Sequence, residues 1–344
     1  MNPSKILIIQ TAFIGDVILI TPLIRAVKEL FPKSTLDVMV IPQTANGLEN
    51  NPHINKILLF DKRKNKVFSF MKMIFKLRSE KYQAVLTSHS SMTTALLIYI
   101  ARIKIRVGFD RWKAKNYLTH KVPHLKNTHK TVNNLELLKV FSDKIFSNQT
   151  ELFPTKFENA IISKKINLIR TKTKKIIAFA PGSVWFTKRW PIKNYIDLSK
   201  KLLQNNFGII LVGSKEEKEI CDKIDKHDNL INLAGELTLL ESAAVIKECD
   251  LLICNDSGAL HIANAMQTDV FAIFGPTVKS IGYFPFRESD FVFELELDCR
   301  PCGSHGGNVC PLEHHNCMKL ISPATVFSKV TEKFTNYGTS ILYL

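Results

Sequence analysis

The segment NDSGALHIANAM at residues 255–266 carries the clearest chemical signal in the chain. A strand-like apolar run ends at Asp256, Ser257 and Gly258 make a turn, and a helical pattern follows. The first backbone N–H groups of a helix have no partner within it, and the helix dipole is positive at that end. The turn therefore predicts a binding site for an anion such as phosphate. His261, in the first helical turn, either donates to that anion or packs as an ordinary core histidine.

A second loop, PGSVWFTKRWP at residues 181–191, also follows a strand-like run and leads into a helix. It offers the hydroxyls of Ser183 and Thr187 and the cation of Lys188. These groups suit a diphosphate, because the charge that develops on a departing diphosphate must be stabilised. The alternative is a basic surface loop, which would leave its two tryptophans exposed without a use.

Carboxylates lie in two further loops that follow apolar runs. Asp16 stands beside Gly15, where the first strand gives way to a helix, and an ionised Asp16 can accept the proton of an attacking hydroxyl. Asp is also a common helix cap, so the same position fits a structural role. In GSKEE at residues 213–217, Glu216 or Glu217 can hydrogen-bond ribose hydroxyls, or both can stabilise the first turn of a helix.

Four of the seven cysteines crowd into CRPCGSHGGNVCPLEHHNC, with the spacing C-x2-C-x7-C-x6-C. Four thiolates that include a C-x2-C pair can hold a structural zinc ion, and the candidate ligands are Cys299, Cys302, Cys310 and Cys317. Buried free thiols or a disulfide are the alternatives. The first 220 residues contain no cysteine, unlike a disulfide-stapled secreted fold, so we expect a reducing compartment.

The net charge of +16 is concentrated in one half of the chain. Residues 1–150 carry 24 Lys and Arg against 9 Asp and Glu, whereas residues 151–344 carry 23 against 22. Basic clusters lie at residues 62–66, 72–81 and 102–115. Such a field attracts nucleic acid, anionic lipid headgroups or phosphorylated substrates, although each cluster alone also fits a solvated helix face.

The apolar runs are too short to cross a membrane. Residues 6–24 are mostly apolar, but Asp16 interrupts them, and no run reaches the roughly 18 residues that a membrane span needs. We interpret this stretch as a buried strand and a helix, not as a signal peptide.

Strand-like runs alternate with helical patterns in both halves, which predicts parallel sheets with helices on both faces. The expected strands are residues 5–10, 36–41, 56–60, 84–88, 106–109, 175–181, 208–213, 230–233, 250–256 and 270–275. The expected helices are residues 20–30, 68–77, 93–101, 192–204, 216–226, 239–247 and 260–266.

A chain of 344 residues is too long for one ordinary core. The polar, basic stretch 156–174 is the expected linker between domains at 1–155 and 175–325, followed by a C-terminal helix or tail at 326–344. The predicted fold class is α/β, with two Rossmann-like doubly wound domains that face each other across a ligand-binding cleft.

Laid out in this way, the sequence resembles the heptosyltransferase family, the glycosyltransferases of family 9 that act with ADP-heptose on lipopolysaccharide. The resemblance covers about residues 5–330. It is carried by ILIIQTAFIGDVILITPLIRAVKELFP, RVGFDR, APGSVWFTKRWP and CNDSGALHIANAMQTDVFAIFGPT. The cysteine segment, ending CPLEHHNCM, resembles the type that adds the second heptose.

The resemblance implies a GT-B fold and an inverting, metal-independent transfer that needs no cofactor besides the nucleotide sugar. It makes Asp16 the catalytic base, and we then favour catalysis over capping there. It implies an acceptor-binding N-terminal domain and a C-terminal domain that binds the nucleotide sugar. The donor-binding residues that it implies are Ser183, Thr187, Lys188, Glu217, Asp256, Ser257, Gly258 and His261.

We therefore expect a cytoplasmic bacterial enzyme, peripheral to the inner membrane, that moves heptose from ADP-heptose to the inner core of lipopolysaccharide. The alternative enzyme would transfer another nucleotide sugar to a capsule or surface glycan. A basic protein that binds nucleic acid or membrane without catalysis would leave the donor loop unexplained, and we expect no nucleic acid partner.

Overall fold

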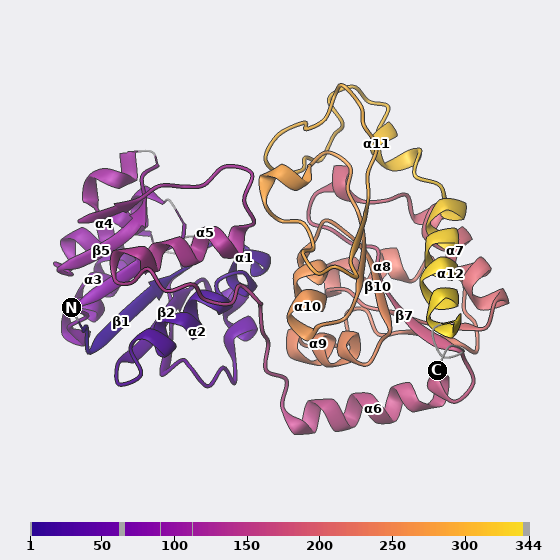
Figure 1. The fold of residues 1–344 in the computed structure, drawn as a ribbon, viewed down its shortest axis with the longest axis horizontal. Coiled ribbons are helices and arrows are strands. Elements are labelled where there is room, and N and C mark those ends of the chain that lie inside the picture. The colour runs from indigo at the N-terminus through magenta and orange to yellow at the C-terminus, as the bar shows by residue number, and fades with distance from the viewer. Residues whose placement is uncertain (1, 62–65, 90, 112, 340–344) are drawn as a thin grey trace. The chain divides into compact units, whose positions relative to one another are not determined.

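The computed structural model describes residues 2–61, 66–89, 91–111 and 113–339, and the chain divides into two compact units between Phe153 and Pro154. Each unit contains a six-stranded sheet whose neighbouring strands are all parallel (Figure 1). The expectation of two doubly wound α/β domains is confirmed. Of the basic cluster 62–66, residues 62–65 lie outside the described residues.

The first unit has the strand order β3-β2-β1-β4-β5-β6. Its strands are β1 (Lys5–Ile9), β2 (Thr35–Val40), β3 (Lys56–Leu59), β4 (Ala84–Thr87), β5 (Ile105–Phe109) and β6 (His120–Val122). Its helices are α1 (Ile14–Ile18), α2 (Thr21–Leu30), α3 (Lys66–Glu80), α4 (Met92–Ile100) and α5 (Lys130–Glu136), with 3-10 turns η1 (Pro42–Leu48), η2 (Lys113–Tyr117) and η3 (Leu137–Val140).

Helices cover both faces of the first sheet, and its central strand β1 is apolar from Ile6 to Ile9. In β1, Ile6 and Ile8 pack with α2 on one face, whereas Leu7 and Ile9 pack with α3 and α4 on the other. Successive side chains of a strand point to opposite faces, so a strand that is buried on both sides is mostly apolar along its length.

The second unit has the order β12-β11-β10-β7-β8-β9. Its strands are β7 (Lys175–Ala180), β8 (Phe207–Leu211), β9 (Leu230–Asn232), β10 (Leu251–Asn255), β11 (Val270–Ile273) and β12 (Phe291–Phe293). Its helices are α6 (Lys156–Arg170), α7 (Ile192–Gln204), α8 (Lys218–Cys221), α9 (Leu239–Lys247), α10 (Gly258–Met266), α11 (Asn316–Lys319) and α12 (Pro323–Thr339), with 3-10 turns η4 (Phe186–Lys188), η5 (Lys215–Glu217) and η6 (Lys279–Ile281).

The stretch 156–174, which we expected to link the domains, contains helix α6 and groups with the second unit. A capping box between Thr155 and Glu158 starts the helix. Ile162, Ile166 and Ile169 are buried at helical spacing, so a minority of apolar residues decides the conformation of this basic segment.

The helix expected over residues 216–226 is shorter than predicted, because the structure has only η5 and α8 there, ending at Cys221. In the expected tail 326–344, α12 extends to Thr339, and residues 340–344 lie outside the described residues. In the described part of the chain, no helix combines the length and apolar character that a membrane crossing requires.

Candidate functional site

Most of the donor residues expected from the sequence follow two neighbouring strands of the second sheet. The loop at residues 181–191, here called the phosphate loop, leaves β7, and Asp256 directly follows β10. Strands β7 and β10 are paired, but the chain continues from them to opposite sides of the sheet, to β8 and β11. In doubly wound sheets, ligands bind outside the carboxyl ends of the strands at such a switch point.

Lys188 and Asp256 form an ion pair at this edge. The Lys188 Nζ lies 2.5 Å from Asp256 Oδ2, and the two side chains are only 13% and 8% exposed. The same carboxylate oxygen accepts a hydrogen bond of 2.6 Å from the hydroxyl of Thr277. The ammonium group is therefore held in one place, so that it can stabilise developing charge without reorganising.

Asn255, the last residue of β10, ties the phosphate loop to the sheet. Its buried side chain donates to the carbonyl oxygens of Pro181 at 2.8 Å and Gly182 at 3.2 Å. Its Oδ1 accepts the N–H of Trp190 at 3.0 Å, and the indole of Trp190 is itself buried in the core. The side chain of Asn255 thus holds both ends of the phosphate loop. Packing in the core accounts for Trp190, one of the two tryptophans of this loop.

Ser183 and Thr187 are both buried in the phosphate loop. The hydroxyl of Thr187 donates to the carbonyl of Gly307 at 3.0 Å and accepts its N–H at 2.8 Å. The ring Nε2 of His315 lies 2.7 Å from the Thr187 carbonyl oxygen. In this structure Thr187 fastens the loop to the segment that contains the clustered cysteines, and its role as a phosphate ligand stays a prediction.

Helix α10 begins as the sequence indicates, with Ser257 as its N-cap and Gly258 as its first residue. The Ser257 side chain makes no capping hydrogen bond to the helix, so it does not occupy the backbone N–H groups of the first turn, of which that of Leu260 donates to the Ser257 carbonyl at 3.3 Å. His261 is buried within this helix, and its ring meets that of Tyr283 edge-on with centroids 6.2 Å apart. The helix end suits a phosphate, whereas His261 fits both of its interpretations.

The structure distinguishes the two glutamates after β8. Glu217 is half-buried, and Glu216 is exposed. Gly182 lies so close to Glu217 that a Cβ there would come within 2.2 Å of its carboxylate. Glu217 Oε2 also accepts the N–H of Ser214 at 2.9 Å in a capping box. Glu217 therefore caps η5 and at the same time stands beside the phosphate loop, as a ribose ligand must.

The four clustered cysteines do not form a metal site in this arrangement. Cys317 is buried, Cys302 is exposed, and Cys299 and Cys310 are intermediate. Across the described residues, no three His, Cys, Asp or Glu side chains come together as metal ligands. Burial, followed by the nearby thiols, raises the pKa of Cys317 to about 11, so its thiol is protonated at neutral pH.

Asp16 lies in the first unit, in the first turn of α1. The N-cap residue of α1 is Phe13, so Asp16 stands within the first turn and is not itself the N-cap. Its carboxylate is half-buried at the positive end of the helix, beyond the carboxyl end of β1. A negatively charged side chain stabilises a helix when it lies in its first turn.

A cation that the sequence analysis did not single out lies near Asp16. Lys130 begins α5, and its Nζ sits 5.4 Å from the centre of the Phe109 ring. Burial lowers the pKa of Lys130, whereas the charge of Asp16 raises it. One turn later, Asn134 donates to the carbonyl of Leu19 at 2.8 Å and so fixes α5 beside α1. Residues 1–150 contain many lysines and arginines, and no sequence pattern distinguishes Lys130 from the others.

Other residues of the site were also missed. Asn255 and Thr277 stand inside the quoted motifs, but their spacing does not show that they hold the phosphate loop and Asp256. His315 and Tyr283 contact the site from distant parts of the chain and carry no local pattern.

The chain is similar to known proteins over most of its length. The family described as glycosyltransferase family 9 (heptosyltransferase) matches residues 70–311. Lipooligosaccharide heptosyltransferase 2 of Campylobacter jejuni is 28% identical over 340 residues, covering 96% of this chain and 99% of that protein.

Two solved structures share the fold. The Escherichia coli ADP-heptose lps heptosyltransferase II superimposes with a TM-score of 0.79 at 21% identity, covering 97% of this chain and 100% of that one. The E. coli heptosyltransferase WaaC with ADP-2-deoxy-2-fluoro heptose gives 0.71 at 17% identity, covering 95% and 99%. With the family match spanning most of its length, the chain belongs to glycosyltransferase family 9, the heptosyltransferase family.

Proposed function

We propose that this glycosyltransferase moves heptose from ADP-heptose to the inner core of lipopolysaccharide, with inversion at the anomeric carbon. The observation that carries the proposal is the switch-point edge of the second sheet. The fixed cation of Lys188 and the N-terminus of α10 there suit the diphosphate of a nucleotide sugar. The carboxylate of Glu217, beside the phosphate loop, suits its ribose. The relatives are named for transfer to lipopolysaccharide or lipooligosaccharide, and one structural neighbour was solved with an ADP-heptose analogue.

In the proposed reaction, Asp16 accepts the proton of the acceptor hydroxyl while the oxygen of that hydroxyl attacks the anomeric carbon. The bond from that carbon to the diphosphate breaks, and ADP leaves with the bonding electrons. Lys188 and the first turn of α10 stabilise the negative charge on the departing diphosphate. Ser183 and Thr187 would contribute hydroxyls to the phosphates, Glu217 would bind the ribose, and Asp256 would hold Lys188 in place for the donor.

The test is incubation of the purified chain with ADP-heptose and truncated lipopolysaccharides that carry either no heptose or a single heptose, followed by mass spectrometry of the lipid. A gain of one heptose is expected. Other nucleotide sugars are tested in parallel, and transfer of a different sugar with none from ADP-heptose would contradict the assignment of the donor.

We propose that the basic first unit binds the phosphorylated acceptor at the cytoplasmic face of the inner membrane. The Debye length falls from about 10 Å at 0.1 M to about 3 Å at 1 M ionic strength, so salt weakens diffuse attraction more than close contacts. The KM for acceptor is therefore expected to rise with salt more steeply than the KM for donor. Equal salt sensitivity of the two constants would show that the +15 charge of residues 1–150 is not used in this way.

Zinc in the cysteine segment stays a prediction from the sequence. If the thiols rearrange around a metal, anaerobically purified protein contains about one zinc per chain. Elemental analysis with thiol titration of the denatured protein decides between the interpretations. Seven titratable thiols per denatured chain and no metal would contradict the zinc prediction and agree with the seven free cysteines of the structure.

A further inference from the structure

Helix α3 carries apolar side chains on two opposite faces. Its inward face supplies Met73, Ile74 and Leu77 to the core of the first unit. Its outward face leaves four large apolar side chains in solvent: Val67 (78% exposed), Phe68 (70%), Met71 (44%) and Phe75 (61%). Phe68, Met71 and Phe75 are three and four residues apart, so they form one stripe along the helix.

The stripe lies in a segment of one charge sign. Residues 62–79 contain no Asp or Glu, and α3 adds Lys72, Lys76 and Arg78. The one acidic residue of the helix, Glu80, is bound by Lys76 at 2.7 Å and by Lys5. Those hydrogen bonds lower the pKa of Glu80 to about 2. An apolar stripe flanked by cations is the composition of helices that lie in a membrane interface.

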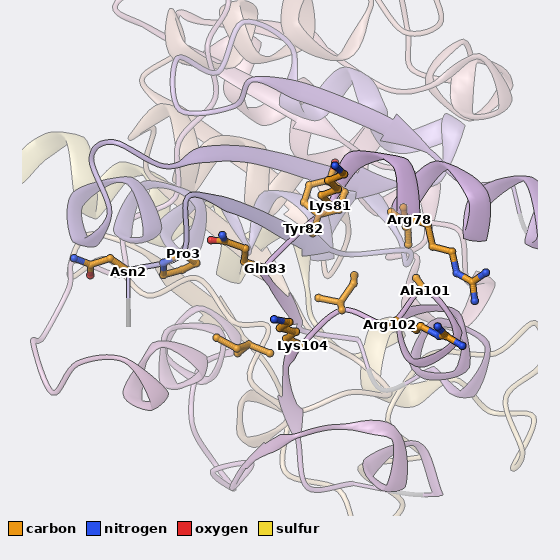
Figure 2. Close-up of a pocket in the computed structure, with 12 residues that line it drawn as sticks. Asn2, Pro3, Arg78, Lys81, Tyr82, Gln83, Ala101, Arg102 and Lys104 are labelled. Carbon is orange, nitrogen blue, oxygen red and sulfur yellow. The ribbon is translucent and has the colours of Figure 1, made fainter.

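A basic cavity lies where α3 ends, at the amino edge of the first sheet. It has a volume of about 700 Å³ and is lined by the start of the chain and by the turns from α3 to β4 and from α4 to β5. Figure 2 shows Arg78 and Lys81 on one side of it and Arg102 and Lys104 on the other. Its lining contains apolar side chains but no carboxylate.

The attraction of cations to the negative ends of helices accounts for only part of the positive charge in this cavity. Two helix C-termini contribute together about one negative charge, against the four cations of the cavity. Lys81 and Arg102 moreover end their helices at φ values of 56° and 59°, in the left-handed region where glycine is favoured. A glycine would end each helix equally well, so the side chains of Lys81 and Arg102 add positive charge to the cavity that the helix ends do not need.

We propose that the outward face of α3 and this cavity together dock on an anionic lipid bilayer. The stripe enters the boundary between headgroups and acyl chains, and the cavity binds lipid phosphate. Charge complementarity selects this partner, because both parts are cationic and the stripe is apolar. The inference rests on the proposed function in that the acceptor there is a membrane lipid.

The position of α3 suits that role. The helix begins after the carboxyl end of β3, the edge of the sheet beyond which Asp16 lies, and returns to the amino end of β4. A bilayer in contact with Val67 and Phe68 is therefore close to the edge where the acceptor would be deprotonated.

Flotation with vesicles of phosphatidylglycerol and phosphatidylethanolamine tests the proposal, with phosphatidylcholine vesicles as the uncharged comparison. The chain is expected to float with the anionic vesicles only. The double substitution Phe68→Ser and Phe75→Ser is expected to lower the partition coefficient at least tenfold. Neutralising Lys81 and Arg102 with glutamine is expected to cost about fivefold for each charge. The matched control is Phe157→Ser, which removes a phenylalanine that is 74% exposed on α6 in the second unit.

A second measurement reports insertion directly. The fluorescence of a Phe75→Trp variant, after subtraction of the parent's signal, is expected to be quenched by brominated anionic lipid. Unchanged flotation of the serine variant, or binding of inorganic pyrophosphate in the cavity without binding of vesicles, would overturn the proposal.

An assay with an acceptor dispersed in detergent separates this proposal from the proposed function. The substitutions of Phe68 and Phe75 are expected to leave kcat there unchanged, because neither residue is a proposed donor ligand and neither contributes to the basic charge proposed to bind the acceptor. A chain that floats as expected but transfers no sugar would contradict the proposed function alone, and a chain that transfers sugar but never floats would contradict the docking proposal alone.

Discussion

Replacing Asp16 by asparagine is expected to lower turnover about a hundredfold or more, the scale of a lost general base, while leaving ADP affinity unchanged. Asparagine keeps the shape of the side chain but cannot accept the proton of the acceptor hydroxyl. The proposed donor residues all belong to the second unit, so the donor contacts remain. Steady-state kinetics and calorimetric titration with ADP measure the two effects.

Two controls make this result interpretable. Asp143→Asn removes an exposed carboxylate from the same unit and is expected to retain the parent's turnover. Loss of a charge in the first turn of α1 costs only about 0.3–1 kcal/mol of stability, so the thermal midpoint of Asp16→Asn should change little. Turnover within threefold of the parent would rule out Asp16 as the base.

Replacing Lys188 by alanine is expected to weaken ADP binding by about 1–3 kcal/mol, the range of a charge-assisted contact. The structure adds a second reason for the loss. Without its partner, the carboxylate of Asp256 keeps its charge near the diphosphate and repels it. Calorimetric titration with ADP measures the change, with the exposed Lys193→Ala in α7 as the matched control.

The double variant Lys188→Ala and Asp256→Asn separates the two contributions. If repulsion by Asp256 accounts for part of the loss, the double variant binds ADP more tightly than Lys188→Ala alone. Unchanged ADP affinity in Lys188→Ala would make this lysine a structural partner of Asp256 and not a donor ligand.

Much of the fold could be predicted from sequence because parallel sheets leave a strong local pattern. Strand β1 is apolar at all but its first position, and such runs read clearly against polar loops. Strands β6 and β12, with three residues each, were not predicted because their pairing depends on neighbours far away in the chain. Helix α6 was missed because its three lysines and one arginine gave the segment a basic character, although the buried Ile162, Ile166 and Ile169 decide its packing.

The candidate site was predictable where backbone geometry alone makes it. The helix start at Ser257 follows from a strand, a turn and a helix in succession. Contacts between distant segments were not predictable. Nothing in the sequence indicates that Lys188 forms an ion pair with Asp256. Nor does it indicate that Glu217, and not Glu216, lies against Gly182. The hydrogen bond between the Thr187 hydroxyl and Gly307 also has no local pattern. Each of these depends on which loops the sheet brings together.

We propose that the acceptor oxygen displaces the diphosphate in a single in-line step, as the role of Asp16 as a base and not a nucleophile requires. The anomeric configuration of the product, determined by NMR against that of the nucleotide-sugar donor, tests this claim most directly. One displacement inverts the configuration, so a product of opposite anomeric configuration is expected. Retention would contradict the account, because it requires a second displacement through a covalent or otherwise shielded intermediate.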